Sequence, residues 1–460
     1  MEIWSQIQTS QHIWNFDATG SIIEAVENQS KPYLYSMVCH DEQNNTIIPM
    51  AEFVTTSHTH LTVSSYLFVV KKYFEKYCKP KSDFVLAPVI VTDFSWTLIT
   101  SILESFNSMN IIKYLDSCFE IIINKNNSNI LKTIIYLCAA HFIKLIIKKV
   151  KKNEPEISDK IKKSFVFSFS LLQNATSFIE FECFFIHILH MFNTPTINNT
   201  VQDSANFIKK ALRSRDSSDL AYLDYESNDS QEEINREKNF ELLLYLDNNQ
   251  KQTIGTVRNS SKFHSYFQNK FESHSKLVKI YDNKDKINPF YSPKLVQIIM
   301  KYIYVMPLWS GIMLNTKTCH LVNFKTKKRT TNNPVENHFQ FNKNSMLNKR
   351  LRVKPSEFVA PNYRFILSKY IQFYLKDTAQ EKKVKQEIVD HLERWKDKKD
   401  SSHVKGFFYQ NIAHFDTLGS NVYTREVIED NNMIEISVNS NSVNNIVNGE
   451  TLNFNILNGN

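Results

Sequence analysis

The sequence contains little glycine, proline and cysteine, and these shortages exclude several classes of protein. Seven Gly and twelve Pro among 460 residues are far below average usage, which argues against collagen-like chains, linker-dominated chains and Gly-rich nucleotide-binding loops. The six cysteines are scattered and form no Cys-x-x-Cys pair. We therefore expect no disulfide framework, and a reducing compartment fits the protein best.

Long uninterrupted apolar runs are also missing. The most apolar long stretch, Ile130–Ile147, is interrupted by Lys132, His141 and Lys144, so it fails as a membrane span. The first residues, MEIWSQIQ, have neither the basic region nor the apolar region of a signal peptide. We expect a protein that is not secreted and has no membrane partner.

Apolar and charged residues set the broad class of the protein. Hydrophobic residues make up 42% of the chain and aromatic residues 13%, which is enough to bury a sizeable core and excludes global disorder. The length predicts two or three domains. Fifty-five Lys and Arg against forty-seven Asp and Glu give a net charge of +8, which permits a polyanionic partner without requiring one.

Residues 12–150 alternate between strand-like and helical patterns. Apolar runs predict five strands, at Ile13–Asp17, Tyr33–Cys39, Ile47–Thr55, Ala87–Thr92 and Ile134–Cys138. Helical spacing predicts helices over Leu61–Tyr77, Ser95–Phe106 and Ala139–Lys152. Hairpin strands followed by strand–helix units favour a mixed sheet with helices packed on it.

The rest of the chain lacks strand alternation. Residues 151–330 have helical periodicity, interrupted by an acidic stretch, Asp216–Glu233, that we expect to be an exposed loop. Residues 331–400 are predicted to be helical and basic. The last thirty residues contain eleven Asn and no Lys or Arg, so we expect residues 401–460 to be a low-complexity, largely disordered tail.

Two aspartates, Asp17 and Asp93, each follow a short apolar strand. A carboxylate at the end of a strand is held rigidly and stays accessible to solvent, which suits a ligand of Mg²⁺. Aspartate is also common at such places as a turn-former or helix cap. The pattern alone leaves both interpretations open.

A Cys-x-x-His pair, Cys138 and His141, follows the last predicted strand. Two such residues could contribute to a zinc site, but a second ligand pair is not evident, because His320 directly follows Cys319. A nucleophilic cysteine with a histidine base is a further alternative. The plainest interpretation is a buried cysteine and a hydrogen-bonded histidine on one helical turn.

Glu336 follows Pro334 in the segment Asn332–Phe339. Proline suits the first helical turn, so Glu336 is predicted to lie in that turn as well. A glutamate in the first turn of a helix is commonly there only because its charge interacts favourably with the helix dipole.

In this order the motifs resemble the cores of DDE-type transposases. The series comprises Asp17-Ala-Thr-Gly20, Pro88-Val-Ile-Val-Thr-Asp93, Cys138-x-x-His141, a helical stretch and Asn332-x-Pro-Val-Glu336. It is most similar to the Mutator-like and hAT-related group, whose ribonuclease-H-like core carries a C-x-x-H signature after the second acid. The resemblance extends over about three-quarters of the chain.

The resemblance implies an α/β ribonuclease-H-like sheet with helices on both faces, interrupted by a large all-α insertion. Residues 12–150 would form the first part of this core and residues 151–330 the insertion. Residues 331–400 would complete the core with the helix of the final Glu and with basic helices. The helical insertion is the place where we expect a dimer or higher oligomer to form.

The resemblance also implies a reaction. Asp17, Asp93 and Glu336 would be the catalytic acids and would hold two Mg²⁺ or Mn²⁺ ions roughly 3.5–4 Å apart. One ion activates water or a 3′-hydroxyl and the other stabilises the leaving oxygen, so that DNA strands are cut and transferred. Cys138 and His141 would have a structural or DNA-positioning role, and no zinc site is assigned.

Basic segments are the predicted contacts to the phosphates of DNA. They comprise Lys148, Lys149, Lys151 and Lys152, then Lys327, Lys328 and Arg329, and then Lys349, Arg350 and Arg352. Each segment is equally compatible with a solvated helix face. Lys325–Arg329 also resembles a weak nuclear-localisation signal, so we expect a nuclear protein and otherwise a cytoplasmic one.

Sixteen residues precede Asp17, too few for the N-terminal DNA-binding module that the resemblance implies. We expect a truncated copy, a partial gene model or a domesticated descendant that retains the core. Three functions stay open: a metal-dependent transposase-like nuclease, a non-catalytic transposon-derived protein that binds DNA or protein, and a helical scaffold with a coincidental series of motifs.

Overall fold

The structure is a computed structural model. It describes residues 13–20, 22–25, 29–41, 46–78, 87–125, 131–153, 156–215, 255–278, 286–315, 331–350 and 352–374, with four strands between 405 and 439. The chain forms two compact units, Met1–Asn362 and Tyr363–Asn460. The first unit contains the five-stranded sheet and all the predicted site residues that the structure describes.

The sheet of the first unit is mixed, as the sequence predicts. Its strands run in the order β3-β2-β1-β4-β5. β1 pairs antiparallel with β2, which pairs antiparallel with β3, whereas β1, β4 and β5 are parallel. The five predicted strands are confirmed as β1 (Ile13–Thr19), β2 (Tyr33–Asp41), β3 (Thr46–Thr55), β4 (Val89–Thr92) and β5 (Ile134–Leu137).

The helices before and after the last strand of the sheet are also close to their predicted positions. They are α2 (His60–Cys78), α3 (Trp96–Ile102), which continues into a π-helical turn at Leu103–Asn107, and α5 (Ala139–Asn153). A further helix, α4 (Ile111–Ile122), was not predicted. Every residue of β4 and β5 is buried. Parallel strands of this kind read as continuous apolar runs because both of their faces are covered.

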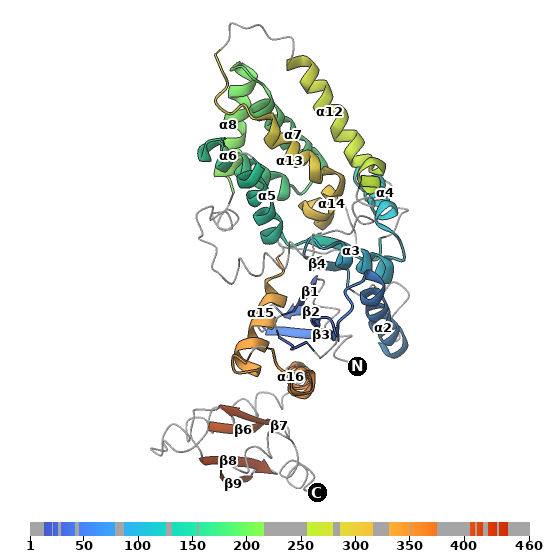
Figure 1. Cartoon of the computed structure of the whole chain (residues 1–460), viewed down its shortest axis with the longest axis vertical. Coiled ribbons are helices and arrows are strands. Elements are labelled where there is room, and N and C mark those ends of the chain that lie inside the picture. The colour runs from blue at the N-terminus through green and yellow to red at the C-terminus, as the bar shows by residue number, and fades with distance from the viewer. Residues whose placement is uncertain are drawn as a thin grey trace. The chain divides into compact units, whose positions relative to one another are not determined.

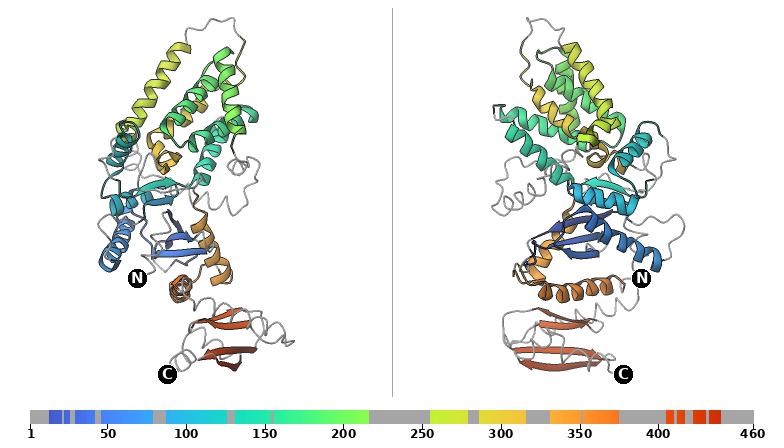
Figure 2. Two further views of the ribbon diagram at one scale, coloured as in Figure 1. Left: turned by 180° about the vertical axis from the view of Figure 1, so that it is seen from behind. Right: turned by 45° about the vertical axis from the view of Figure 1, so that its right-hand side comes forward.

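The described elements between α5 and residue 315 are helices, apart from an isolated antiparallel bridge between Thr196 and Ile287. The helices are α6 (Asp159–Gln173), α7 (Phe178–Asn193), α8 (Asn199–Arg213), α12 (Lys262–Val278), α13 (Pro293–Tyr302) and the short α14 (Met306–Trp309). Figures 1 and 2 show these helices gathered together, away from strands β1–β3. The predicted acidic loop, Asp216–Glu233, lies outside the described residues.

An aromatic core joins these helices to α5, the helix that follows β5. Trp309 is fully buried, and its ring lies 5.5 Å from that of Phe142 on α5 and 5.1 Å from that of Phe169 on α6. The segment Pro293–Leu314 is long and apolar enough to cross a membrane by length and composition, but 78% of its most apolar stretch is buried inside the protein. A buried core helix has the same composition.

The chain returns to the sheet after residue 331. α15 (Asn333–Phe341) is followed by a π-helical turn at Asn342–Met346, and α16 (Pro355–Tyr374) continues across the boundary of the two units. Figure 1 shows α15 alongside strands β1–β3. The predicted start of α15 is confirmed, with Pro334 and Glu336 both in the first turn.

Helices cover both faces of the sheet. Asp17, Ser36 and Glu52 are register partners across β1, β2 and β3, so their side chains point to the same face. α15 lies on that face, where His338 contacts Glu52.

The opposite face contacts α2. Tyr35 and Phe53 are register partners one position along from Ser36 and Glu52, so they point the other way. Their rings stack 4.8 Å apart, and Tyr66 of α2 stacks on Phe53 at 4.4 Å.

The structure describes four strands within residues 401–460, where the sequence predicts a largely disordered tail. The second unit contains β6 (Lys405–Tyr409) paired with β7 (Ile412–Asp416), and β8 (Val422–Glu429) paired with β9 (Asn432–Asn439). The physical reason is visible in β9, where Ile434, Ile436 and Val438 alternate with polar residues, as a strand requires. The high asparagine content obscured this alternation. Residues 440–460 lie outside the described residues.

Candidate functional site

Asp17 and Asp93 come from neighbouring parallel strands. Phe16 of β1 is the register partner of Thr92 of β4, so the two aspartates follow at the same level. Adjacent strands lie about 4.8 Å apart. β1 continues to Thr19 instead of ending at Asp17 as predicted, while β4 does end immediately before Asp93.

Glu336 reaches this place from α15. The imidazole of His141 lies between two of the acids, with Nδ1 2.6 Å from Asp93 Oδ1 and Nε2 3.4 Å from Glu336 Oε1. The charges of Asp93, Glu336 and His141 all act on Asp17. The structure therefore brings together the three acids that the sequence singled out, and we call Asp17, Asp93, His141 and Glu336 the acid cluster.

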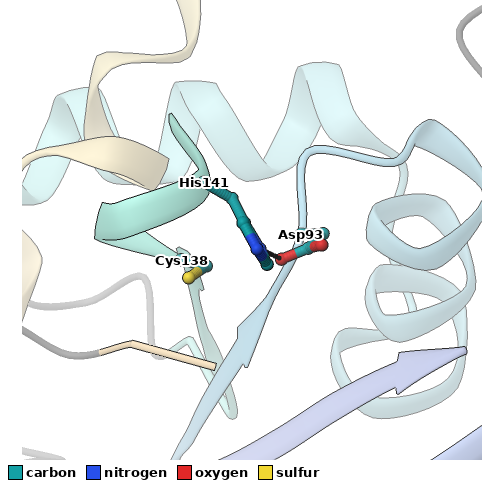
Figure 3. A group of neighbouring side chains, drawn as sticks. All are labelled: Asp93, Cys138 and His141. Carbon is teal, nitrogen blue, oxygen red and sulfur yellow. Dashed lines mark hydrogen bonds and ion pairs between the residues drawn. The ribbon is translucent and has the colours of Figure 1, made fainter. Parts of the chain in front are cut away.

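The Cys-x-x-His pair connects the sheet to the helix of the last acid. The Cys138 backbone N–H donates to the Thr92 carbonyl oxygen at 2.8 Å, and its Sγ accepts from the Asn332 backbone N–H at 3.2 Å. Asn332 is the residue that precedes α15. Figure 3 shows His141 and Asp93 pointing toward each other, with Cys138 beside them.

The acid cluster holds more negative than positive charge. Burial, followed by the repulsion from Asp93 and smaller effects that include Glu336, raises the pKa of Asp17 well above its usual value. The attraction of Asp93 raises the pKa of His141 well above its usual value, which favours the imidazolium form of His141. One imidazolium beside three carboxyl groups leaves a site that favours further cations.

Two sets of ligands for metal ions overlap at this site. Asp17, Asp93 and Glu336 offer carboxylate oxygens, which are the ligands that Mg²⁺ and Mn²⁺ prefer. Asp93, Cys138 and His141 offer ligand atoms within 4.8 Å of one another, a softer set in which three residues leave a fourth position open. Among the described residues, this second set is the one whose ligand atoms lie close enough together to hold an ion, although Nδ1 of His141 is hydrogen-bonded to Asp93 and Sγ of Cys138 to Asn332.

The predicted basic residues lie in three places. Lys148, Lys149, Lys151 and Lys152 lie toward the end of α5, the helix that begins beside His141. Lys151 is about 15 Å along the helix axis from His141, at 1.5 Å per residue. Lys327, Lys328 and Arg329 lie outside the described residues.

The third basic segment differs from its predicted helical form. Lys349, Arg350 and Arg352 are exposed and lie in the connection between α15 and α16. Lys349 and Arg352 have left-handed backbone angles, with φ of 62° and 60°. Such angles end a helix, and they turn the chain toward α16.

Sequence reasoning missed a second polar cluster on the same face of the sheet. Ser36 and His338 are buried, the side chain of Glu52 is 5% exposed, and both residues are hydrogen-bonded to Glu52. One signal was present in the sequence, since Ser36 interrupts the otherwise apolar face formed by Leu34 and Val38. Nothing in the sequence pairs it with a helix three hundred residues later.

Comparisons with known proteins give a limited result. No family model matches the chain. Over 161 residues, 34% of its length, the chain is 27% identical to the 120.7 kDa protein in NOF-FB transposable element of Drosophila melanogaster. The match covers 14% of that relative, so the chain spans much less than the length of the curated protein it matches.

Among solved structures, the chain is similar to the Drosophila P element transposase strand transfer complex. The TM-score is 0.31 and the sequence identity 14%, over 80% of this chain and 77% of that one. At this TM-score we base no argument on the similarity. The sequence match relates about a third of the chain to a transposable-element protein, and neither comparison identifies the Mutator-like and hAT-related group.

Proposed function

We propose that the chain is the catalytic core of a transposase-like enzyme that cuts DNA strands and transfers them with two Mg²⁺ or Mn²⁺ ions. The observation that carries the proposal is the convergence of Asp17, Asp93 and Glu336, which come from two adjacent parallel strands and a helix far along the chain. Three carboxylates in one place repel one another, and a cation site is the usual reason to hold them together.

The fold supports this proposal. A mixed five-stranded sheet with two acids at its central parallel strands suits the ribonuclease-H-like core that the motifs imply. The helical chain between α5 and α15 suits the implied insertion. The partial match to a transposable-element protein points in the same direction.

The residues of the acid cluster, and Cys138 beside them, would have different roles in the proposed reaction. Bound cations would supply an activated oxygen nucleophile and stabilise the leaving oxygen of a phosphodiester. Asp17, Asp93 and Glu336 would hold them, and Asp17 would then lose the repulsion that raises its pKa. His141 orients the Asp93 carboxylate through its Nδ1. Cys138 keeps the first turn of α15, and with it Glu336, at the end of β4 and β5.

DNA is the proposed partner because the basic segments and the net charge of +8 favour a polyanion. Phosphates would be contacted by Lys148–Lys152 and by Lys349, Arg350 and Arg352. An oligomer formed through the helices between α5 and α15, and a nuclear location, remain predictions from the sequence.

A second candidate is a non-catalytic, transposon-derived protein that binds DNA or protein. One observation favours it: His141 lies against both Asp93 and Glu336. An imidazolium in this position offsets part of the charge of the acids without any metal ion. Such a protein would bind DNA with a steep salt dependence and would not cut it.

DNA cleavage in the presence of Mg²⁺ or Mn²⁺ tests the proposal. We expect Asp93→Asn to lower the cleavage rate roughly 1,000-fold, since a metal supplies several kcal/mol of transition-state stabilisation and about 1.4 kcal/mol is a factor of ten. Asp159→Asn on α6 is the matched control, because that carboxylate is 76% exposed and lies outside the acid cluster. Equal cleavage by wild type and Asp93→Asn would contradict the proposal. Salt-sensitive DNA binding without any cleavage would favour the second candidate.

A further inference from the structure

A second carboxylate–imidazole pair lies under α15 and has no part in the proposed reaction. Glu52 Oε1 of β3 is 2.5 Å from His338 Nε2 of α15, and the two side chains are only 5% and 1% exposed. Buried glutamates are rare unless they are paired. His338 lies two residues after Glu336, so the same short helix carries a residue of the acid cluster and a residue of this pair.

The partners of Glu52 come from every element around it. Ser36 Oγ of β2 donates to Glu52 Oε1 at 2.6 Å, and Asn362 Nδ2 of α16 donates to Oε2. Asn342, one turn beyond His338, lies 3.2 Å from His338 Nε2. We call these five residues, Ser36, Glu52, His338, Asn342 and Asn362, the Glu52 network.

The Glu52 carboxylate is stabilised in its charged form. Burial alone would raise the pKa of Glu52, but the hydrogen bonds and charge of His338 and the hydrogen bonds from Asn362 and Ser36 hold it below its usual value. An ionised carboxylate that accepts several hydrogen bonds fixes its partners more strongly than a neutral group does.

The Glu52 network is a group of polar residues surrounded by buried apolar residues. Around it, α15 packs on the sheet through a cluster of buried residues that comprises Ile22, Ile23, Leu34, Val38, Val335, Phe339, Leu347, Val353 and Phe358. Apolar contacts of this kind are not directional, so they tolerate a small shift or rotation of a short helix. A buried charged pair with its hydrogen bonds made has one geometry.

We propose that Glu52 and His338 are positioning residues that set where α15 lies on the sheet and thereby where Glu336 meets Asp17 and Asp93. The inference rests on the proposed function, since Glu336 matters only if it binds a cation. Asp17, Ser36 and Glu52 are neighbours in register, so the sheet itself fixes the spacing between the acid cluster and the Glu52 network. A shift of α15 by one residue, 1.5 Å along its axis, would separate Glu336 from its partners.

Two measurements on the full chain test the inference. The first is the affinity for Mn²⁺ alone, by titration of the free-ion signal in electron paramagnetic resonance. The second is the alkylation rate of Cys138 without metal, resolved by peptide mass spectrometry. Cys138 is 1% exposed and lies against the residue before α15, so its alkylation reports release of the helix independently of any metal.

The variants separate positioning from general stability. His338→Leu removes the hydrogen bond to Glu52, and His338→Gln retains a donor that can reach it. His274→Leu is the matched control, because His274 of α12 is also a buried histidine, 8% exposed, hydrogen-bonded to Asn193 and His190 and unconnected with α15. All variants are compared under conditions where each is fully folded.

We expect His338→Leu to weaken Mn²⁺ binding about tenfold or more, as for other residues that orient metal ligands, and to speed alkylation of Cys138. His338→Gln should restore both, and His274→Leu should change neither. Equal Mn²⁺ affinity and equal Cys138 protection in wild type and His338→Leu overturn the inference. So do equal effects of His338→Leu and His274→Leu.

Failure of the inference differs from failure of the proposed function. If wild type does not bind Mn²⁺, the proposed function fails, while the alkylation of Cys138 still shows whether the Glu52 network holds α15. If His338→Leu does not fold, Ser36→Ala takes its place, because it removes one hydrogen bond to Glu52 and keeps the ion pair. A smaller change in the same direction, about threefold, is then expected, and unchanged binding and alkylation overturn the inference.

Discussion

Among the described residues of the first unit, the two shortest carboxylate–imidazole contacts join Asp93 to His141 and Glu52 to His338. The nitrogen–oxygen distances are similar, 2.6 and 2.5 Å. Their surroundings differ: the side chains of Asp93 and His141 are 11% and 31% exposed, and those of Glu52 and His338 are 5% and 1% exposed. The first pair is accessible to a substrate and the second is not.

The neighbours of each pair explain the difference in role. Glu52 is surrounded by donors, which hold its pKa below the usual value in spite of burial. Asp17, beside the first pair, is surrounded by other acids, which together with burial raise its pKa. The same two functional groups thus stabilise the fold in one place and leave an unbalanced charge in the other. An unbalanced charge that solvent can reach is the better sign of a functional site.

The largest difference in stability should appear when one partner is removed from each pair. We expect His338→Leu to lower the free energy of unfolding by about 3–5 kcal/mol, because it leaves the Glu52 carboxylate buried without its main partner. Asp93→Asn should cost less, because the charge of Asp93 contributes to the raised pKa of Asp17 and its loss relieves that repulsion. Urea unfolding of the metal-free protein measures both values. Equal costs would mean that the two pairs do not differ in the way we describe.

His274, a buried histidine that is hydrogen-bonded to Asn193 and His190, extends the comparison. Burial lowers the pKa of His274 from 6.5 to about 4. The unfolded chain therefore binds a proton between these values that the folded chain does not, so this contribution to stability is complete above pH 6.5 and is lost as the pH falls. We expect a loss of about 2 kcal/mol between pH 7 and pH 5 from this group. Urea unfolding at several pH values measures it, and an identical pH dependence in His274→Leu would contradict the assignment.

The smallest expected effect on stability is that of Asp17→Asn, which should raise the free energy of unfolding instead of lowering it. Because the folded protein raises the pKa of Asp17, the charged form of this carboxylate opposes folding, and its contribution to stability is lost as the pH rises through the folded-state pKa. Asp17→Asn should therefore stabilise the metal-free protein by about 1 kcal/mol at pH 7 while it removes DNA cleavage.

Thermal unfolding in EDTA at pH 7 and at pH 4 measures this gain. At pH 4 the gain should shrink, because the wild-type carboxyl group is then protonated as well. A variant that is less stable than wild type at pH 7 would show that Asp17 is a stabilising residue, as Glu52 is.

The sequence was a good guide to local structure. The five strands of the sheet could be recognised because continuous or alternating apolar residues mark them, and α15 because Pro334 suits its first turn. The positions of Asp17, Asp93 and Glu336 could be proposed only as a series, since each residue alone has a plainer explanation. Their proximity depends on long-range packing, which local patterns in the sequence do not reveal.

Two features were not predicted from local sequence patterns: the Glu52 network and the strands of the second unit. Glu52 is bonded to His338 and Asn362, which are 286 and 310 residues away along the chain, and no periodicity relates such distant positions. The strands of the second unit were missed for the opposite reason, because composition was weighed above the alternation in β9. The prediction of a basic helix at Lys349 and Arg352 was also wrong, since these residues lie in a turn with left-handed backbone angles.

The sequence distance between the second and third acids has a consequence for synthesis of the protein. β1, β4 and β5 can pair as soon as residue 137 has been made, but Glu336 and the Asn362 partner of Glu52 come much later. Closing so long a loop is entropically costly, and it occurs late in folding. A nascent chain would therefore carry the sheet before it carries the full set of acids, and the acid cluster is complete only after α15 has been made.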